Sequence, residues 1–380
     1  MRFICKKTEL SDAITNISRV VPQKSTIPAL EGIKLKITPG NAELTAYNLE
    51  MGIRTNIKAE TSDSGEFVLN SRLFSEFTKK MAGEEIIFTI DENNVIHLSS
   101  EATECDFSVM SADEYPDLPV IDSKRSFSVP QNTLRSMINM TSYAVAQNEN
   151  KPIFTGELFD IDAESFTMVA IDGFRLAIRN ETISNSENFN FVVPKKALME
   201  VSTLIREDCS ENCLISVNDR HIMFEINNFI IISRLLEGVF HNYRMSIPTG
   251  HKTEVFISKK DFSASLERCA LIIDEKNKCP IRCEIGNGVM KINCKTAIGK
   301  VNDVISADIS GEAVTIGFNT RLMLEALKAA EGDKVRIRLN GAMKVIEILP
   351  PMGENYIFLV MPIHALIFII FTIMHNQIII

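Results

Sequence analysis

The sequence predicts an α+β fold made of three repeated domains, each with two helices and several antiparallel strands. The first observation behind this prediction is an internal repeat, because segments of one pattern begin at Phe3, Phe127 and Val255, at offsets of 124 and 128 residues. The other two observations are amphipathic helices and alternating hairpins, which recur in every copy. A register held over about 25 residues indicates duplication of one structural unit.

Each copy opens with a short strand and an amphipathic helix. In the first copy, Leu10, Ala13, Ile14 and Ile17 follow the i, i+3, i+4, i+7 spacing of a helix with one apolar face. A loop then ends at a proline that all copies share, Pro28 in the first, and the next strand begins there.

A second helix and a set of hairpins complete each copy. The helix recurs as LNSRLFSEFTKKM from Leu69, VPKKALMEVSTLI from Val192 and FNTRLMLEALKAA from Phe318. The hairpins are alternating stretches broken by turns near Asn94, Asn218 and Asn340. We therefore expect domains at residues 1–123, 124–250 and 251–364, followed by an atypical apolar tail at residues 365–380.

Charge is divided unevenly along the chain. Its 380 residues include 40 Lys and Arg against 49 Asp and Glu, a formal net charge of −9. Taken whole, this charge argues against a nucleic-acid binder, whose phosphate contacts need a cationic surface. The repeated helices, with the loops after the first helix of each copy, nevertheless carry +9, which leaves −18 for the rest. Either one face attracts a polyanion, or Lys and Arg simply favour solvated helices.

The sequence lacks the motifs of catalysis and cofactor binding. There is no Gly-x4-Gly-Lys-Ser/Thr loop, and the lone Gly-x-Gly, at residues 286–288, falls in a predicted hairpin turn. The six histidines are scattered and the carboxylate pairs flank turns, so we expect no metal, no cofactor and no catalytic residue. The eight cysteines are expected to be reduced, and the start MRFICKKTEL lacks the apolar core of a secretory signal, so we expect a cytoplasmic protein. These features favour a binding module over an enzyme.

Six motifs in a fixed order give the chain a resemblance to a known family. They are STIPAL from Ser25, YNLEM from Tyr47, SADEYPDLP from Ser111, MVAIDGFRLA from Met168, SRLLEGVFHNYRMSIP from Ser233 and LVMPI from Leu359. From Met1 to about His364 the chain resembles the bacterial DNA polymerase III beta subunit, the sliding clamp. The resemblance implies three clamp domains per chain, with helices lining the inside and antiparallel sheets outside, and two chains closing head to tail into a ring. Such a homodimer would hold a polymerase on double-stranded DNA by topology, independently of sequence and without catalysis of its own.

The resemblance also implies three sets of site residues. Sequence-independent DNA contacts are expected from basic residues on the repeated helices and loops: Lys24, Arg72, Lys79, Lys80, Lys151, Lys195, Lys196, Lys276 and Lys278. The ring interface would pack Phe107 and Val109 on Ile272 and Ile273 of the other subunit. A cleft for partner peptides with Leu or Phe anchors is expected at Phe154, Ile171, Gly173, Phe174, Arg175, Leu176, His241, Met245, Leu359, Val360, Met361, Pro362 and Ile363.

Expected partners are the catalytic subunit of the replicative polymerase, the clamp loader complex, and other clamp-binding polymerases and repair proteins; no membrane is expected among them. His241 stands where the family usually has Pro, and Met245 where it often has Arg, so the preferred partner motif is expected to differ. Two other interpretations stay open: a repeat scaffold that binds proteins without encircling DNA, and an enzyme of nucleic-acid metabolism.

The tail at residues 365–380 departs from the family, which ends shortly after the Met-Pro-x motif. Its nearly uninterrupted apolar stretch, the ten residues from Ala365 to Met374, is shorter than the ~20 residues that span a bilayer, so membrane insertion is disfavoured. An altered C-terminus from a frameshift or readthrough is the favoured explanation, and one hypothesis places the tail over the adjacent cleft.

Overall fold

The computed structural model describes residues 1–101, 103–122, 125–147, 151–185, 187–207, 209–273 and 281–363. Its contacts group the chain into two compact units, the first made of residues 1–135 with 196–236, the second of residues 136–195 with 237 onward. The chain passes from the first unit to the second within α3 (Gln131–Thr141) and returns at the start of α4 (Lys195–Leu204). Lys276, Lys278 and the apolar tail lie outside the described residues.

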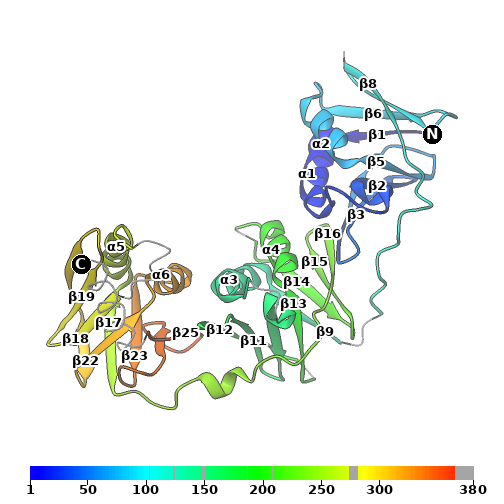
Figure 1. Cartoon of the computed structure of the whole chain (residues 1–380). Coiled ribbons are helices and arrows are strands. Elements are labelled where there is room, and N and C mark those ends of the chain that lie inside the picture. Colours follow the sequence, from blue (N-terminus) through cyan, green and yellow to red (C-terminus); the bar gives the residue numbers. More distant parts are fainter. Residues whose placement is uncertain are drawn as a thin grey trace. The chain divides into compact units, whose positions relative to one another are not determined.

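The first unit contains two antiparallel sheets and the helices α1 (Lys7–Ile17) and α2 (Ser71–Lys80) (Figure 1). The smaller sheet has the order β1 (Arg2–Lys6), β6 (Glu85–Ile90), β7 (Val95–Ser100), β8 (Thr103–Ser108). The larger has the order β5 (Gly65–Asn70), β2 (Gly32–Thr38), β3 (Asn41–Tyr47), β4 (Met51–Lys58), β16 (Phe229–Arg234), β15 (His221–Ile226), β14 (Asn212–Val217), β9 (Arg125–Pro130).

The helices of the first unit form where the repeat predicted them. All four apolar residues predicted on one face of α1 are buried, which confirms the helical periodicity. Helix α2 begins where the Asn70 side chain accepts a hydrogen bond from the Leu73 N–H, a standard N-cap. Behind these helices the rings of Phe3 and Phe88 stack with centroids 4.3 Å apart, so an aromatic core holds the helices on the small sheet.

The second unit repeats this plan with α5 (Lys259–Ala270) and α6 (Thr320–Ala329). Its larger sheet has the order β13 (Phe189–Pro194), β10 (Gly156–Ile161), β11 (Ser165–Ile171), β12 (Arg175–Thr182), β25 (Tyr356–Val360), β24 (Ile346–Leu349), β23 (Lys334–Leu339), β17 (Thr253–Ser258), β21 (Asp308–Gly311). Its smaller sheet has the order β20 (Lys300–Ser306), β19 (Val289–Lys295), β18 (Ile281–Gly286), β22 (Val314–Phe318).

Two strand pairs join neighbouring repeats into continuous sheets. In the first unit β4 pairs antiparallel with β16, which places Ile53 opposite Ile231. In the second unit β12 pairs antiparallel with β25, which places Ala177 opposite Phe358. Both pairs join strands from different repeats, so backbone hydrogen bonds as well as apolar contacts connect one repeat to the next.

The predicted hairpin turns lie where Asn and Gly can adopt a left-handed backbone. Asn94 has φ 57°, and in the turn of the lone Gly-x-Gly, Asn287 has φ 52° and Gly288 φ 75°. The Asn218 side chain closes a third turn by accepting hydrogen bonds from the N–H groups of Arg220 and His221. These positions confirm the turns predicted there.

Most of the described cysteines are buried in the core. The seven described cysteines are free, and burial raises the pKa of the Cys5 and Cys213 thiols to about 12. Such thiols are core residues of low reactivity.

Over the part of the chain that the structure describes, no helix is both long and apolar enough to cross a bilayer.

Candidate functional sites

The basic residues of α2 lie on the exposed side of the helix. Phe74 and Thr78 turn inward, whereas Arg72, Lys79 and Lys80 are exposed. Lys80 is ion-paired with Glu76 at 3.2 Å, with both side chains mostly exposed, so this pair adds little stability and leaves the ammonium accessible.

Other predicted DNA contacts occupy loops and the start of a helix. Lys24 is exposed in the loop before the 3-10 turn Pro28–Glu31. Lys151 is exposed, and its ammonium lies 5.6 Å from the centroid of the Phe154 ring. At the start of α4, Lys196 is exposed and Lys195 partly so.

The outer edge of the small sheet in the first unit is strand β8. Among the described strands β8 pairs only with β7. The partly buried Phe107 of β8 meets Phe77 of α2 edge to face at 4.8 Å, and Phe77 itself is 37% exposed. Val109 follows at the end of the strand, partly exposed. This edge therefore combines unused backbone hydrogen-bonding groups with apolar side chains.

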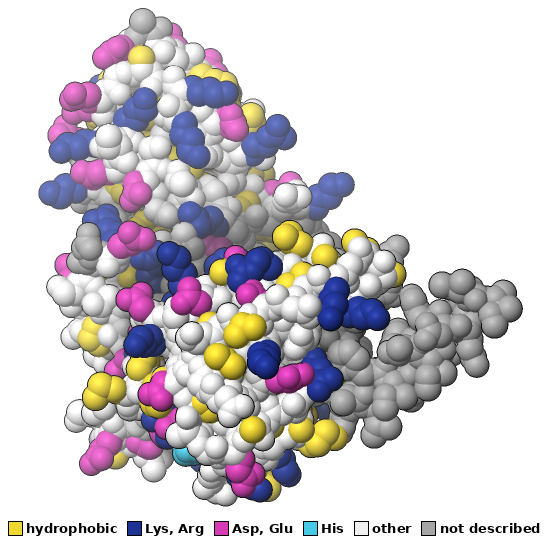
Figure 2. Space-filling view, turned by 90° about the vertical axis from the view of Figure 1, so that its left-hand side faces the viewer, with side chains coloured by type: hydrophobic (Ala, Val, Ile, Leu, Met, Phe, Trp, Pro, Cys, Tyr) yellow, Lys and Arg dark blue, Asp and Glu magenta, His cyan; other side chains and the backbone are white. Residues whose placement is uncertain are grey.

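The second unit has a comparable edge at β20. Among the described strands β20 pairs only with β19. Beside it, Ile272 and Ile273 follow α5 and are partly buried against the core, whereas Leu271 is 83% exposed. Figure 2 shows hydrophobic side chains between Lys and Arg side chains on the side of this unit that carries α5 and β19.

Three segments predicted for the peptide cleft are joined within the second unit. The pairing of β12 with β25 places Leu176 opposite Leu359, and the Met361 N–H donates to the Phe174 carbonyl at 2.9 Å. The loop that carries His241 and Met245 is tied to β10, because the Tyr243 hydroxyl donates to Asp160 at 2.8 Å. Backbone pairing and one side-chain hydrogen bond thus connect three segments of the second unit that are far apart in the sequence.

The exposure of these cleft residues varies widely. Gly173, Phe174, His241, Met245 and Met361 are exposed; Phe154, Ile171, Pro362 and Ile363 are partly buried; Arg175, Leu176, Leu359 and Val360 are buried. Phe174 is 66% and Met245 81% exposed, which is unusual for large apolar side chains. The exposed members can touch a ligand directly, whereas the buried members support them.

Comparison with known proteins decides the family. Three family models for the DNA polymerase III beta subunit match in succession: the N-terminal domain at residues 1–119, the central domain at 128–242 and the C-terminal domain at 244–364. The "Beta sliding clamp" of Bacillus subtilis is 30% identical, over 96% of this chain and all of that protein. The chain belongs to the DNA polymerase III beta subunit family.

Solved structures agree with this assignment. A DNA polymerase sliding clamp from Bacillus subtilis has a TM-score of 0.92 and 29% identity, covering 96% of this chain and 99% of that one. A putative DNA polymerase III beta subunit from Eubacterium rectale has a TM-score of 0.91 and 28% identity, covering 96% and 100%. As a member of the family, the chain has three beta-clamp domains of helices and antiparallel sheet. It is a processivity clamp of DNA polymerase III and not a catalytic subunit.

Sequence reasoning missed several apolar residues around the sites of this beta subunit. Phe240 meets Phe154 edge to face at 5.4 Å, beside Val239, which is 93% exposed. Leu73 on α2 is 47% exposed near Phe77. The sequence did contain a signal for each of them. Leu73 is an apolar residue on the otherwise polar face of α2, and Val239 and Phe240 are apolar residues in a segment between strands. Only the fold reveals which residues lie next to them.

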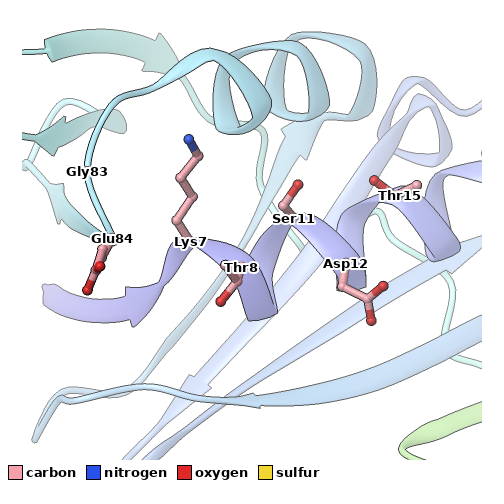
Figure 3. Close-up of a pocket in the computed structure, with 7 residues that line it drawn as sticks. All are labelled: Lys7, Thr8, Ser11, Asp12, Thr15, Gly83 and Glu84. Atoms are coloured by element: carbon pink, nitrogen blue, oxygen red, sulfur yellow. The ribbon is translucent and has the colours of Figure 1, made fainter.

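The described chain also has a shallow pocket of about 540 Å³ beside α1, lined mostly by residues with polar side chains (Figure 3). Thr8, Ser11 and Thr15 supply hydroxyls, and Glu84 lies at its end. The Lys7 ammonium donates to the carbonyl of Met81 at the end of α2. This lysine therefore helps to hold the two helices together.

Proposed function

We propose that two copies of this chain close head to tail into a ring around double-stranded DNA. One observation carries the proposal: β8 and β20 are two different sheet edges of one chain, each without a second partner strand among the described residues, and each bordered by exposed apolar side chains. Edge β8 of one copy would pair with β20 of the other. Two identical heterologous contacts close a dimer when the rotation between copies is a half turn.

The side chains of the two edges support this pairing. In the proposed ring, Phe107 and Val109 pack against Ile272 and Ile273 of the other subunit. Glu104 on β8 and Lys300 on β20 are both exposed and of opposite charge, which favours the unlike edges over pairing of like edges.

The exposed lysines and Arg72 would face the DNA. Such contacts with phosphates carry no sequence information, and they permit sliding because no base is read. We propose this role for Lys24, Arg72, Lys79, Lys80, Lys151, Lys195 and Lys196, and for Lys276 and Lys278 outside the described residues.

The exposed apolar surface around Phe174, Met245 and Met361 would bind extended peptide segments of partner proteins. Its proposed partners are the catalytic subunit of the replicative polymerase, the clamp loader, and other clamp-binding polymerases and repair proteins, all in the cytoplasm. Apolar anchors suit this surface, and flexible methionines adapt to several partners. The proposed domain boundaries are residues 1–123, 124–250 and 251–364.

Native mass in solution tests the ring. One chain has a mass of 42.6 kDa, and we expect twice that mass at micromolar concentration. Phe107→Ala in one edge and Ile272→Ala in the other should each shift the population towards one chain. A wild-type chain that is strictly monomeric at all concentrations would overturn the proposal and favour a scaffold that binds proteins without encircling DNA.

A further inference from the structure

His97 lies between two carboxylates on the small sheet of the first unit. Asp106 of β8 stands directly opposite it, and Asp106 Oδ1 lies 2.6 Å from His97 Nδ1. On the other side of the imidazole, Asp91 Oδ2 lies 3.8 Å from His97 Nε2. Asp91 is held there because its Oδ1 accepts hydrogen bonds from the N–H groups of Asn93 and Val95, both at 2.9 Å. Each nitrogen of the imidazole therefore faces an anionic group.

The neighbouring strands add further charges to the same face of the sheet. Glu104 lies two residues before the aspartate of β8, on the same side of that strand. Thr89 of β6, directly beside the imidazole, is uncharged, and Arg2 of β1 stands opposite Thr89 one strand further away. Lys6 and Glu85 stand opposite each other at the far end of this face. The immediate surroundings of the imidazole are therefore acidic.

These surroundings affect the protonation of His97. The hydrogen bond to Asp106 is the main cause that raises the pKa of His97 above its ordinary 6.5. Desolvation opposes the rise, and the charges of Asp106 and Asp91 add to it. His97 is therefore charged in mildly acidic solution and neutral in alkaline solution.

The pair of His97 and Asp106 borders the edge that we propose for ring closure. Phe107, the next residue on β8, packs against Phe77 of α2. Successive side chains of a strand point to opposite faces, so Asp106 points away from the helices of the first unit. Its side chain is 64% exposed, and its charge can act on a strand that pairs with β8.

The edge proposed to receive β8 is basic on the corresponding face. Asp303 of β20 pairs with Arg268 of α5, so Lys300, an odd number of residues away, points away from the helices of the second unit. Lys295 of β19 stands directly opposite Lys300, and both are exposed. Like charges directly opposite each other in antiparallel strands repel, so these lysines favour an anionic neighbour.

We infer that His97 is a pH switch of ring closure. Neutral His97 leaves the negative charge of Asp106 to attract Lys295 and Lys300 of the other copy, whereas a proton on His97 offsets that charge and weakens the ring. The inference rests on the proposed head-to-tail ring and adds a regulation to it. Because the lysines disfavour the proton on His97, closure releases protons, and association strengthens as the pH rises.

The size of the effect follows from Coulomb's law. Two unit charges about 10 Å apart in water change an equilibrium constant by about twofold. A dimeric ring contains the contact twice, so the dissociation constant should be about fourfold higher at pH 6 than at pH 8.5. This difference should vanish in about 1 M salt, where the Debye length is about 3 Å.

Sedimentation equilibrium of the full-length chain at low ionic strength measures this dissociation constant at both pH values. His97→Gln keeps the position neutral, and His97→Lys keeps it charged. Lys300→Gln removes one of the charges that the switch acts on. His221→Gln, which replaces a histidine of β15 in the larger sheet of the same unit, is the matched control.

The wild type and His221→Gln should both show the difference of about fourfold between the two pH values. His97→Gln should dimerise at pH 6 as tightly as the wild type does at pH 8.5. His97→Lys should be weak at both pH values, and Lys300→Gln should have a smaller pH dependence than the wild type.

Three results would overturn the inference while leaving the ring in place: a wild-type dimer whose dissociation constant is the same at both pH values, a dimer that is tighter at pH 6, or a pH dependence that persists in His97→Gln. A pH dependence that is unchanged in high salt would also contradict it, because the proposed attraction is screened there. A wild-type chain that is monomeric under all these conditions would reject the ring itself, and the inference with it.

Discussion

Glu157 is a carboxyl group in the core of the second unit, and its replacement by Gln isolates the effect of its charge. The residue is fully buried, and its carboxylate accepts hydrogen bonds from the hydroxyls of Thr141 and Ser142. Burial raises the pKa of Glu157 from an ordinary 4.5 to about 7, although the two hydroxyls and Lys195 lower it in part. The folded chain therefore holds this proton up to about pH 7, whereas the unfolded chain releases it near pH 4.5.

The sign of the pH dependence follows from this difference. Between pH 4.5 and 7 the folded state binds more protons than the unfolded state, so the free energy of unfolding falls as the pH rises. A pKa shift of this size corresponds to a contribution of about 3 kcal/mol to the free energy of unfolding. This contribution is present in full below pH 4.5 and is lost above pH 7. Glu157→Gln keeps the shape and cannot ionise. Its amide can donate to the Thr141 hydroxyl, which itself donates to the Met137 carbonyl at 2.8 Å.

Thermal unfolding of the full-length chain between pH 5 and pH 9 measures the effect. At pH 8 to 9 Glu157→Gln should unfold at a temperature higher than the wild type by roughly 5–10 °C, and near pH 5 the difference should shrink. Glu164→Gln removes an exposed carboxylate of the same repeat and serves as the control. A difference between Glu157→Gln and wild type that is the same at pH 5 and pH 9 would refute the reasoning.

Three further predictions concern the backbone, the ring edge and the DNA contacts. Gly311→Ala should lower the free energy of unfolding by more than about 2 kcal/mol in urea titrations, because Gly311 has φ +94° and a Cβ would lie 2.0 Å from the Lys252 carbonyl oxygen. Phe107→Ala should raise the dimer dissociation constant by at least about tenfold in analytical ultracentrifugation, since an aromatic anchor is lost from both interfaces of the ring. Lys79→Ala with Lys80→Ala should reduce the slope of log affinity for short duplex DNA against log salt concentration by about one to two.

Each of these predictions has its own control. Gly250→Ala should be nearly neutral, because no atom lies within 4 Å of its added Cβ, and an equal loss at both glycines would contradict the strain argument. For the ring edge, a Phe107→Ala chain that dimerises like the wild type would place the interface elsewhere. For DNA, Lys36→Ala removes a strand lysine that is ion-paired with Glu66 at 3.0 Å; if it lowers the salt slope as much as the helix variant, binding is not confined to the helices.

Local patterns predicted the helices and turns correctly because their causes lie within a few residues. The apolar face of α1 and the left-handed turns at Asn94 and Asn287 depend on spacing and residue type alone. The repeat then extended each local prediction to three places in the chain.

Other features depend on contacts between distant segments. The joining of β4 to β16 was not predictable, since both strands are apolar enough to pair with several others. Arg175 belongs to a motif assigned to a surface cleft, yet Glu325 and Tyr143, far away in the sequence, draw its side chain inward. Glu157 similarly reads as an ordinary polar residue at the start of a strand, and only the fold places it fully inside.

Retention on DNA of different topology tests the central claim of a closed ring most directly. The chain is loaded onto a nicked circular plasmid by the clamp loader, isolated with the DNA by gel filtration, and the plasmid is then cut once. We predict that the chain stays on the circle and leaves the linear DNA by sliding off its ends. Equal retention before and after the cut would contradict encirclement and would mean that the chain binds DNA only through its surface charges.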